Sequence, residues 1–178
     1  MCIRDSQEAA YSGVTHLIDT GCRKILFLGG PKGVYTTGER LKGYRQALRE
    51  AEIPFQKEYI TYGAYSTASG YERVRHIIEA YPETDAIFAG ADTIAIGVLR
   101  ALRELNIPVP GQVSVLGFDN IMLSADLTPA LTTVAQPIYE MGYRAARKLL
   151  ALIGGDPEGA KSECMSTTLV QRESTRSR

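Results

Sequence analysis

Short apolar runs alternate with longer amphipathic stretches along most of the chain. The apolar runs are hydrophobic throughout, which is typical of strands buried on both faces of a parallel sheet. They predict strands at residues 24–29, 59–62, 85–89, 113–117, 131–135 and 165–170. Apolar residues at helical spacing predict helices at 7–20, 39–52, 69–81, 93–106 and 137–153. This alternation indicates an α/β fold, a parallel sheet with helices on both faces.

The stretch from Asp85 to Asn120 contains the clearest strand–helix–strand unit. Its first strand ends at Gly90, and Asp92 is in position to cap the helix that follows. Its second strand ends at Asp119. Ligands bind such sheets beyond the carboxyl ends of the strands, where Asp92 and Asp119 both fall.

Composition narrows the class of protein. The chain has 178 residues, of which 44% are apolar and 22% charged, so it can bury a core. Lys plus Arg and Asp plus Glu number 20 each, and a net charge of zero argues against a nucleic-acid surface. Cys2, Cys22 and Cys164 have no disulfide or metal spacing and indicate reduced thiols in a cytoplasmic protein. No apolar run reaches the roughly 18 residues of a membrane span, so we expect no membrane partner.

Signatures of catalysis are absent from the sequence. Residues 33–38 have the glycine spacing of a phosphate-binding loop, but Glu39 and Arg40 follow where Lys and Ser or Thr are required. His16 and His76 lie on predicted helices, away from any nucleophile, and we interpret them as surface residues. We therefore expect no enzyme, no metal site and no cofactor.

Polar residues near the carboxyl ends of strands form the better candidate site. Each of them lies just past a strand or near the start of a helix: Arg40, Tyr65, Asp92, Asp119 and Gln136. For Asp92 a helix cap is the simpler interpretation, and for Arg40 a solvated helix residue. Together they suit a polyhydroxylated ligand, because charged groups bind vicinal hydroxyls and a ring stacks on C–H patches. We expect Arg40 and Asp119 close enough for one ligand to bridge them.

The helix at 93–106 has apolar residues on more than one side. When Ile94, Val98 and Leu102 face the sheet, Ile96 and Leu99 point away from it. Either the helix is covered on two sides, or these residues form an apolar patch that meets a partner subunit.

An ordered set of motifs resembles the lac-repressor family of bacterial transcription regulators, from about Asp5 to Thr175. The motifs are Gly29-Gly-Pro31, Arg40-Leu-Lys-Gly-Tyr44, Ser69-Gly-Tyr71, Gly90-Ala-Asp92, Ala95-Ile-Gly97, Val113-Ser-Val-Leu-Gly-Phe-Asp-Asn120, Pro129-Ala-Leu-Thr-Thr133, Gln136-Pro137 and Leu169-Val-Gln-Arg-Glu-Ser-Thr175. The resemblance implies the effector-sensing core of such a regulator, a periplasmic-binding-protein-like fold of type I. Such a core binds a small effector, often a sugar, and controls operator DNA binding by a helix-turn-helix head.

The resemblance also implies roles for single residues. Arg40 and Asp119 match the family's effector-binding arginine and aspartate, Tyr65 an aromatic over the ligand, and Gln136 a crossover glutamine. Ala91 departs from the pattern, since sugar-binding members often have Asn there, and Cys22 stands where His is common. The surface that pairs subunits in the family's homodimers corresponds to Ile96, Leu99, Leu123 and Leu127.

A division of the chain follows from the same resemblance. Residues 1–135 match the C-terminal subdomain, nearly complete and entered by a crossover near residues 5–10. Residues 136–160 match a helix that returns to an N-terminal subdomain that is mostly missing, and residues 161–178 bring the last strand back. The abrupt start leads us to expect a piece of a longer protein. The alternative is a periplasmic sugar-binding protein of a transporter or chemoreceptor, against which Gln136-Pro137, the residue 169–175 motif and the unpaired cysteines count.

Overall fold

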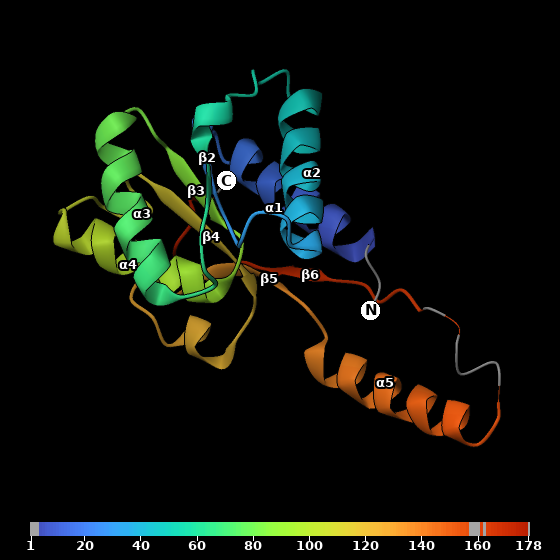
Figure 1. The fold of residues 1–178 in the computed structure, drawn as a ribbon. Coiled ribbons are helices and arrows are strands. Elements are labelled where there is room, and N and C mark those ends of the chain that lie inside the picture. The colour runs from blue at the N-terminus through green and yellow to red at the C-terminus, as the bar shows by residue number, and fades with distance from the viewer. Residues whose placement is uncertain (1–3, 157–160, 162, 178) are drawn as a thin grey trace.

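A single mixed sheet forms the centre of the computed structural model, which describes residues 4–156, 161 and 163–177 (Figure 1). Its strand order is β2–β1–β3–β4–β5–β6. The strands are β1 (Ile25–Gly29), β2 (Ile60–Tyr62), β3 (Ala86–Ala89), β4 (Ser114–Asp119), β5 (Thr132–Ala135) and β6 (Thr168–Val170). The first five are parallel, as expected, whereas β6 pairs with β5 in the antiparallel direction.

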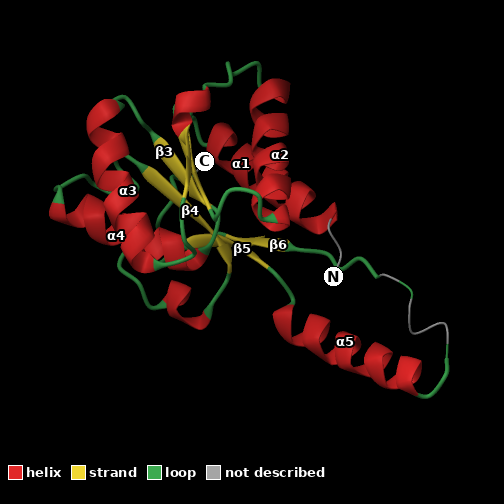
Figure 2. Cartoon of the chain, in the orientation of Figure 1, coloured by secondary structure: helices red, strands yellow, loops and turns green. Residues whose placement is uncertain are grey.

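Two pairs of helices cover the two faces of the sheet (Figure 2). The first pair is α1 (Arg4–Asp19) and α2 (Tyr35–Glu50), which pack on Phe27, Phe88 and Phe118. The second is α3 (Thr67–Ala80) and α4 (Asp92–Glu104), which pack on Leu28, Ile87 and Val115. Successive strand residues thus enter different cores, which explains why the central strands β1 and β3 are apolar at every position. Short 3-10 turns, η1 (Lys57–Tyr59) and η2 (Met122–Ala125), complete the connections.

Helix α5 (Ile138–Ile153) stands apart from this body (Figure 1). It contains no buried residue. Large apolar side chains are exposed along it: Ile138, Tyr139, Tyr143, Leu149, Leu150, Leu152 and Ile153. The apolar side chains of this helix are therefore not covered by the described part of the chain. Residues 157–160 of the expected 136–160 segment lie outside the described residues.

The C-terminal segment 171–177 runs back along the sheet and is bound tightly to it. Ser174 is fully buried; its Oγ donates to the Val115 carbonyl at 2.6 Å and accepts from the Thr132 N–H at 2.8 Å. The Thr175 hydroxyl lies 3.0 Å from His16 Nε2. His16 is half-buried and contacts this segment, whereas His76 is exposed as expected of a surface residue.

The structure also bears on the cysteines, on membrane spans and on metal-binding groups. Cys22 is buried and Cys164 is exposed, and Cys2 lies outside the described residues. Within residues 4–156, 161 and 163–177, no helix has the length and apolar character needed to cross a membrane. No group of His, Cys, Asp and Glu with metal-binding geometry is found in the same part of the chain.

Candidate functional site

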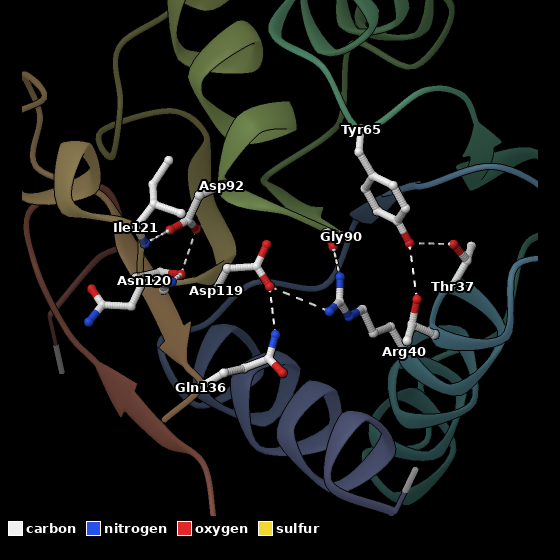
Figure 3. A network of polar contacts seen from close by, with 11 residues as sticks. Thr37, Arg40, Tyr65, Gly90, Asp92, Asp119, Asn120, Ile121 and Gln136 are labelled. Carbon is white, nitrogen blue, oxygen red and sulfur yellow. Dashed lines mark hydrogen bonds and ion pairs between the residues drawn. The ribbon is translucent and has the colours of Figure 1, made fainter. Parts of the chain in front are cut away.

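The polar residues expected at the site meet at the carboxyl edge of the sheet (Figure 3). Asp119 ends β4, Gln136 directly follows β5, and Gly90 directly follows β3. Arg40 reaches the same point from the second turn of α2, the helix that follows β1. Parallel strands bring these positions together because all their carboxyl ends lie on one side.

Arg40 is the centre of the cluster and is only 6% exposed. Its guanidinium donates to the Gly90 carbonyl, lies 3.8 Å above the Phe118 ring, and places Nη2 3.5 Å from Asp119 Oδ1. Its buried Nε has no hydrogen-bond partner among the described residues. Burial lowers the pKa of Arg40, an effect that the negative charge of Asp119 opposes. The alternative of a solvated helix residue is therefore wrong.

Asp119 is the acceptor of the cluster. Its Oδ1 accepts a hydrogen bond of 2.7 Å from Gln136 Nε2 as well as the long contact from Arg40. Burial raises the pKa of Asp119, while Arg40 and Gln136 act in the opposite direction. One quarter of its side chain is exposed. A partly open carboxylate beside a desolvated guanidinium can bind a polar ligand with charge-assisted hydrogen bonds.

Tyr65 lies on the side of Arg40 away from Asp119 (Figure 3). Its hydroxyl is 2.7 Å from Thr37 Oγ1, and 37% of the residue is exposed. The ring covers Gly30, where an added Cβ would come within 2.1 Å of it. A glycine is thus needed at position 30 for the Tyr65 ring to lie at this rim.

Asp92 departs from both sequence-based interpretations. The N-cap residue of α4 is Ala91, so Asp92 is not a cap. Asp92 is fully buried behind the turn that follows Asp119, and its two oxygens accept from Thr133 Oγ1 at 2.6 Å and the Ile121 N–H at 2.9 Å. Burial raises the pKa of Asp92 to about 6. The prediction that Asp92 contacts the ligand therefore requires correction, because the Asp92 carboxylate faces the turn.

Sequence reasoning missed residues that support the site. Arg172 in the C-terminal segment donates from Nη2 to Asn120 Oδ1 at 2.8 Å and from Nη1 to the Leu131 carbonyl at 2.7 Å. Thr133 binds Asp92, and Phe118 lies under Arg40. The available signal was that Phe118, Asn120, Thr133 and Arg172 all belong to the quoted motifs.

The residues expected to pair subunits differ in exposure. Leu99 is only 8% exposed and belongs to the core under α3 and α4, which agrees with the alternative of a helix covered on two sides. Ile96 and Leu127 are half-buried, and Leu123 is 49% exposed. Met122, which sequence reasoning did not select, is 89% exposed beside them.

Known proteins are similar to this chain in sequence and in fold. Residues 14–175 match the family described as periplasmic binding protein-like domain. Catabolite control protein A of Priestia megaterium is 37% identical over 146 residues, covering 82% of this chain and 44% of that protein. The HTH-type transcriptional repressor CytR of Escherichia coli (strain K12) is 34% identical over 172 residues, covering 97% of this chain and 50% of CytR.

Solved structures agree with the similarity found in sequence. The transcriptional regulator CelR in complex with cellobiose superposes with a TM-score of 0.88 at 33% identity, covering 96% of this chain and 52% of CelR. This chain spans about half the length of the curated relatives it matches. The chain belongs to the periplasmic-binding-protein-like domain family, in the form found in effector-sensing domains of lac-repressor-type regulators.

Proposed function

We propose that this chain is the effector-sensing part of a lac-repressor-type transcription regulator and binds a small polyhydroxylated molecule at Arg40 and Asp119. The observation that carries the proposal is the buried guanidinium of Arg40, stacked on Phe118 and only loosely paired with Asp119 at 3.5 Å. A structural ion pair would be expected at hydrogen-bond distance with better geometry. The long contact instead leaves both groups able to bind a ligand.

The chemistry of the cluster suits a sugar. The Arg40 guanidinium donates hydrogen bonds and the Asp119 carboxylate accepts them. A sugar hydroxyl can do both, so two neighbouring hydroxyls can bridge the two side chains. Gln136 orients the carboxylate by donating to Oδ1. The exposed Tyr65 ring offers an apolar face for C–H patches. Cellobiose bound to CelR is consistent with this ligand class.

The proposal includes the division of the chain. In it, residues 1–135 and 161–178 form one subdomain of the sensor, and residues 136–160 belong with a second subdomain. Two observations support this: α5 has no buried residue, and the chain returns from it to β6 beside β5. The ligand cleft would then lie between the two subdomains.

The proposal for the whole protein rests on its relatives. We place it in the cytoplasm as a homodimer that binds operator DNA through a helix-turn-helix head and catalyses no reaction. CytR and catabolite control protein A support regulation of transcription over a periplasmic sugar receptor. A net charge of zero also fits a chain that leaves DNA contacts to another domain.

Calorimetry on the full-length gene product tests the sensor function. Titration with cellobiose and with a panel of monosaccharides should identify a sugar that binds. Asp119→Asn and Arg40→Lys should each weaken that binding by roughly 2–4 kcal/mol, because groups of the ligand are left buried and unpaired. Asp126→Asn, an exposed carboxylate in the next turn, is the matched control and should bind normally. Normal binding by both site variants would show that the site is elsewhere.

A further inference from the structure

The turn that carries Asp119 has an unusual backbone. Asp119 has φ +116° and Asn120 has φ +54°, both in the region that favours glycine. Such residues cost on the order of 1–3 kcal/mol each and persist only where the surrounding structure holds them. Two in succession at the proposed ligand contact raise the question of what fixes the turn.

Three side chains bind the turn, and Figure 3 shows one of them, Asp92, beside Ile121. Asp92 Oδ2 accepts from the Ile121 N–H at 2.9 Å. The Thr133 hydroxyl accepts from the Asn120 N–H at 3.4 Å and donates to Asp92 Oδ1 at 2.6 Å. Arg172 holds the Asn120 side chain. Asp92 thus completes a continuous set of hydrogen bonds that joins α4, β5 and the turn.

Nothing else in the described structure accounts for a carboxylate at this position. Asp92 is fully buried, makes no ion pair among the described residues, and does not cap α4. The sheet even leaves space for it, because a Cβ at Gly117 would come within 2.2 Å of Asp92 Oδ1. Burying a carboxylate is costly, and the visible return for Asp92 is that it holds the turn, by accepting from the Ile121 N–H and from the Thr133 hydroxyl that itself binds the Asn120 N–H.

We propose that Asp92 is a positioning residue, which directs the Asp119 carboxylate toward the ligand by fixing the Asp119–Ile121 turn without touching the ligand itself. The inference rests on the proposed function only in taking Asp119 as the ligand contact. Loss of the Asp92 carboxylate releases the Ile121 N–H, and the strained turn relaxes to a backbone conformation that points Asp119 elsewhere.

Amide spectra of the 178-residue chain test this without any ligand. The charged groups near Asp92 are Asp119 on β4 and, farther away, Arg40 on α2. In a pH titration by ¹H–¹⁵N NMR, the Ile121 amide shift should change with a midpoint near 6, the pKa of its acceptor Asp92. Asp92→Asn should abolish this transition, and Asp126→Asn should keep it. A transition that survives in Asp92→Asn would overturn the proposal, since Asp119 would then be its cause.

Hydrogen exchange gives a second measurement if Asp92 variants fold poorly. Thr133→Val removes the hydroxyl that links Asn120 to Asp92 while keeping the side-chain volume. The Asn120 and Ile121 amides should then exchange at least about tenfold faster, which corresponds to one lost hydrogen bond. Thr133→Ser should restore slow exchange, and the Val115 amide of β4 should change in neither variant. Faster exchange along all of β4, or none at the turn, would overturn the proposal.

These measurements separate the two proposals. If the turn responds as expected but no sugar binds the full-length protein, the positioning role stands and the proposed function fails. If Asp119→Asn abolishes sugar binding while Asp92→Asn binds as the wild type does, the proposed function stands and the positioning role fails.

Discussion

Burial sets Arg40 and Asp92 apart from most charged residues of this chain. Arg40 offsets the loss of water with the Gly90 carbonyl, the Phe118 ring and Asp119. Asp92 offsets it with two hydrogen bonds from uncharged donors. Uncharged donors compensate a buried carboxylate incompletely, which is why burial raises its pKa.

The raised pKa makes stability depend on pH in a defined direction. The pKa of Asp92 is about 6 in the folded chain and 3.8 in its ordinary state. Between these values the folded chain binds more protons, so the contribution of Asp92 to unfolding free energy rises as pH falls. At about 1.4 kcal/mol for each pKa unit, the full change is roughly 3 kcal/mol.

We predict that Asp92→Asn has its largest relative advantage at neutral pH. The unfolding free energy of the variant minus that of the wild type should be more favourable to the variant at pH 7 than at pH 4, by roughly 2–3 kcal/mol. Urea unfolding at the two pH values measures this, and effects of other carboxylates cancel in the difference. An equal difference at both values would contradict a raised pKa.

The site was predictable from sequence to the extent that it depends on strand ends. Asp119 and Arg40 could be placed at one edge because parallel strands align their carboxyl ends. The role of Asp92 could not be predicted, because a helix cap and the first helical residue differ by a single position. Its partners, Thr133 and Ile121, come from other parts of the chain, and only the fold brings them to it.

Elements buried on both faces were the easiest to predict. Strands β1 and β3 are apolar throughout, and β4 is apolar between Ser114 and Asp119. All three are packed on two sides, and their positions agree with the sequence pattern. The direction of β6 was harder to predict. Its three residues are exposed or half-buried, so they show little of the apolar pattern of a buried strand. Its place is fixed by the C-terminal segment that follows it.

We predict that this segment stabilises the fold through Ser174. Ser174→Ala would leave the Val115 carbonyl and the Thr132 N–H without a side-chain partner in a fully buried position. The unfolding free energy should fall by about 1–3 kcal/mol. Ser177→Ala, an exposed serine of the same segment, should change it by less than about 0.5 kcal/mol. Urea unfolding of both variants decides the matter, and equal stabilities would refute the role of Ser174.

In contrast to Ser174, exposed residues of helix α5 should contribute little to the unfolding free energy. Leu150 is 68% exposed, so Leu150→Glu in this chain should alter the unfolding free energy by no more than about 0.5 kcal/mol. Leu116→Ala in the core should lower it by about 2–5 kcal/mol. Because α5 lacks packing, its amides should also exchange faster than those of β4. A large loss of stability in Leu150→Glu would mean that α5 packs on the body in solution.

At the scale of the whole molecule, two regions of exposed apolar surface bear on association. One is α5, and the other lies where α4 meets the segment around η2. The second region contains Ile96, Met122, Leu123 and Leu127. Leu99 of α4 and Thr128, which lies three residues after η2, line one hollow, so the end of this segment lies beside α4. Exposed apolar patches of this kind mark surfaces for association.

We predict that the chain forms a symmetric dimer through this second region. Residues from α4 of one subunit would face η2 of its partner, because a twofold axis repeats the same patch on both sides. Ile96→Lys places a charge at a half-buried position of α4 and leaves the buried Leu99 unchanged, and it should yield monomers in sedimentation velocity. Phe55→Lys, which charges an exposed aromatic residue between α2 and β2, should leave the dimer intact. A monomeric wild type, or an Ile96→Lys variant that sediments as the wild type does, would exclude this surface as the subunit interface.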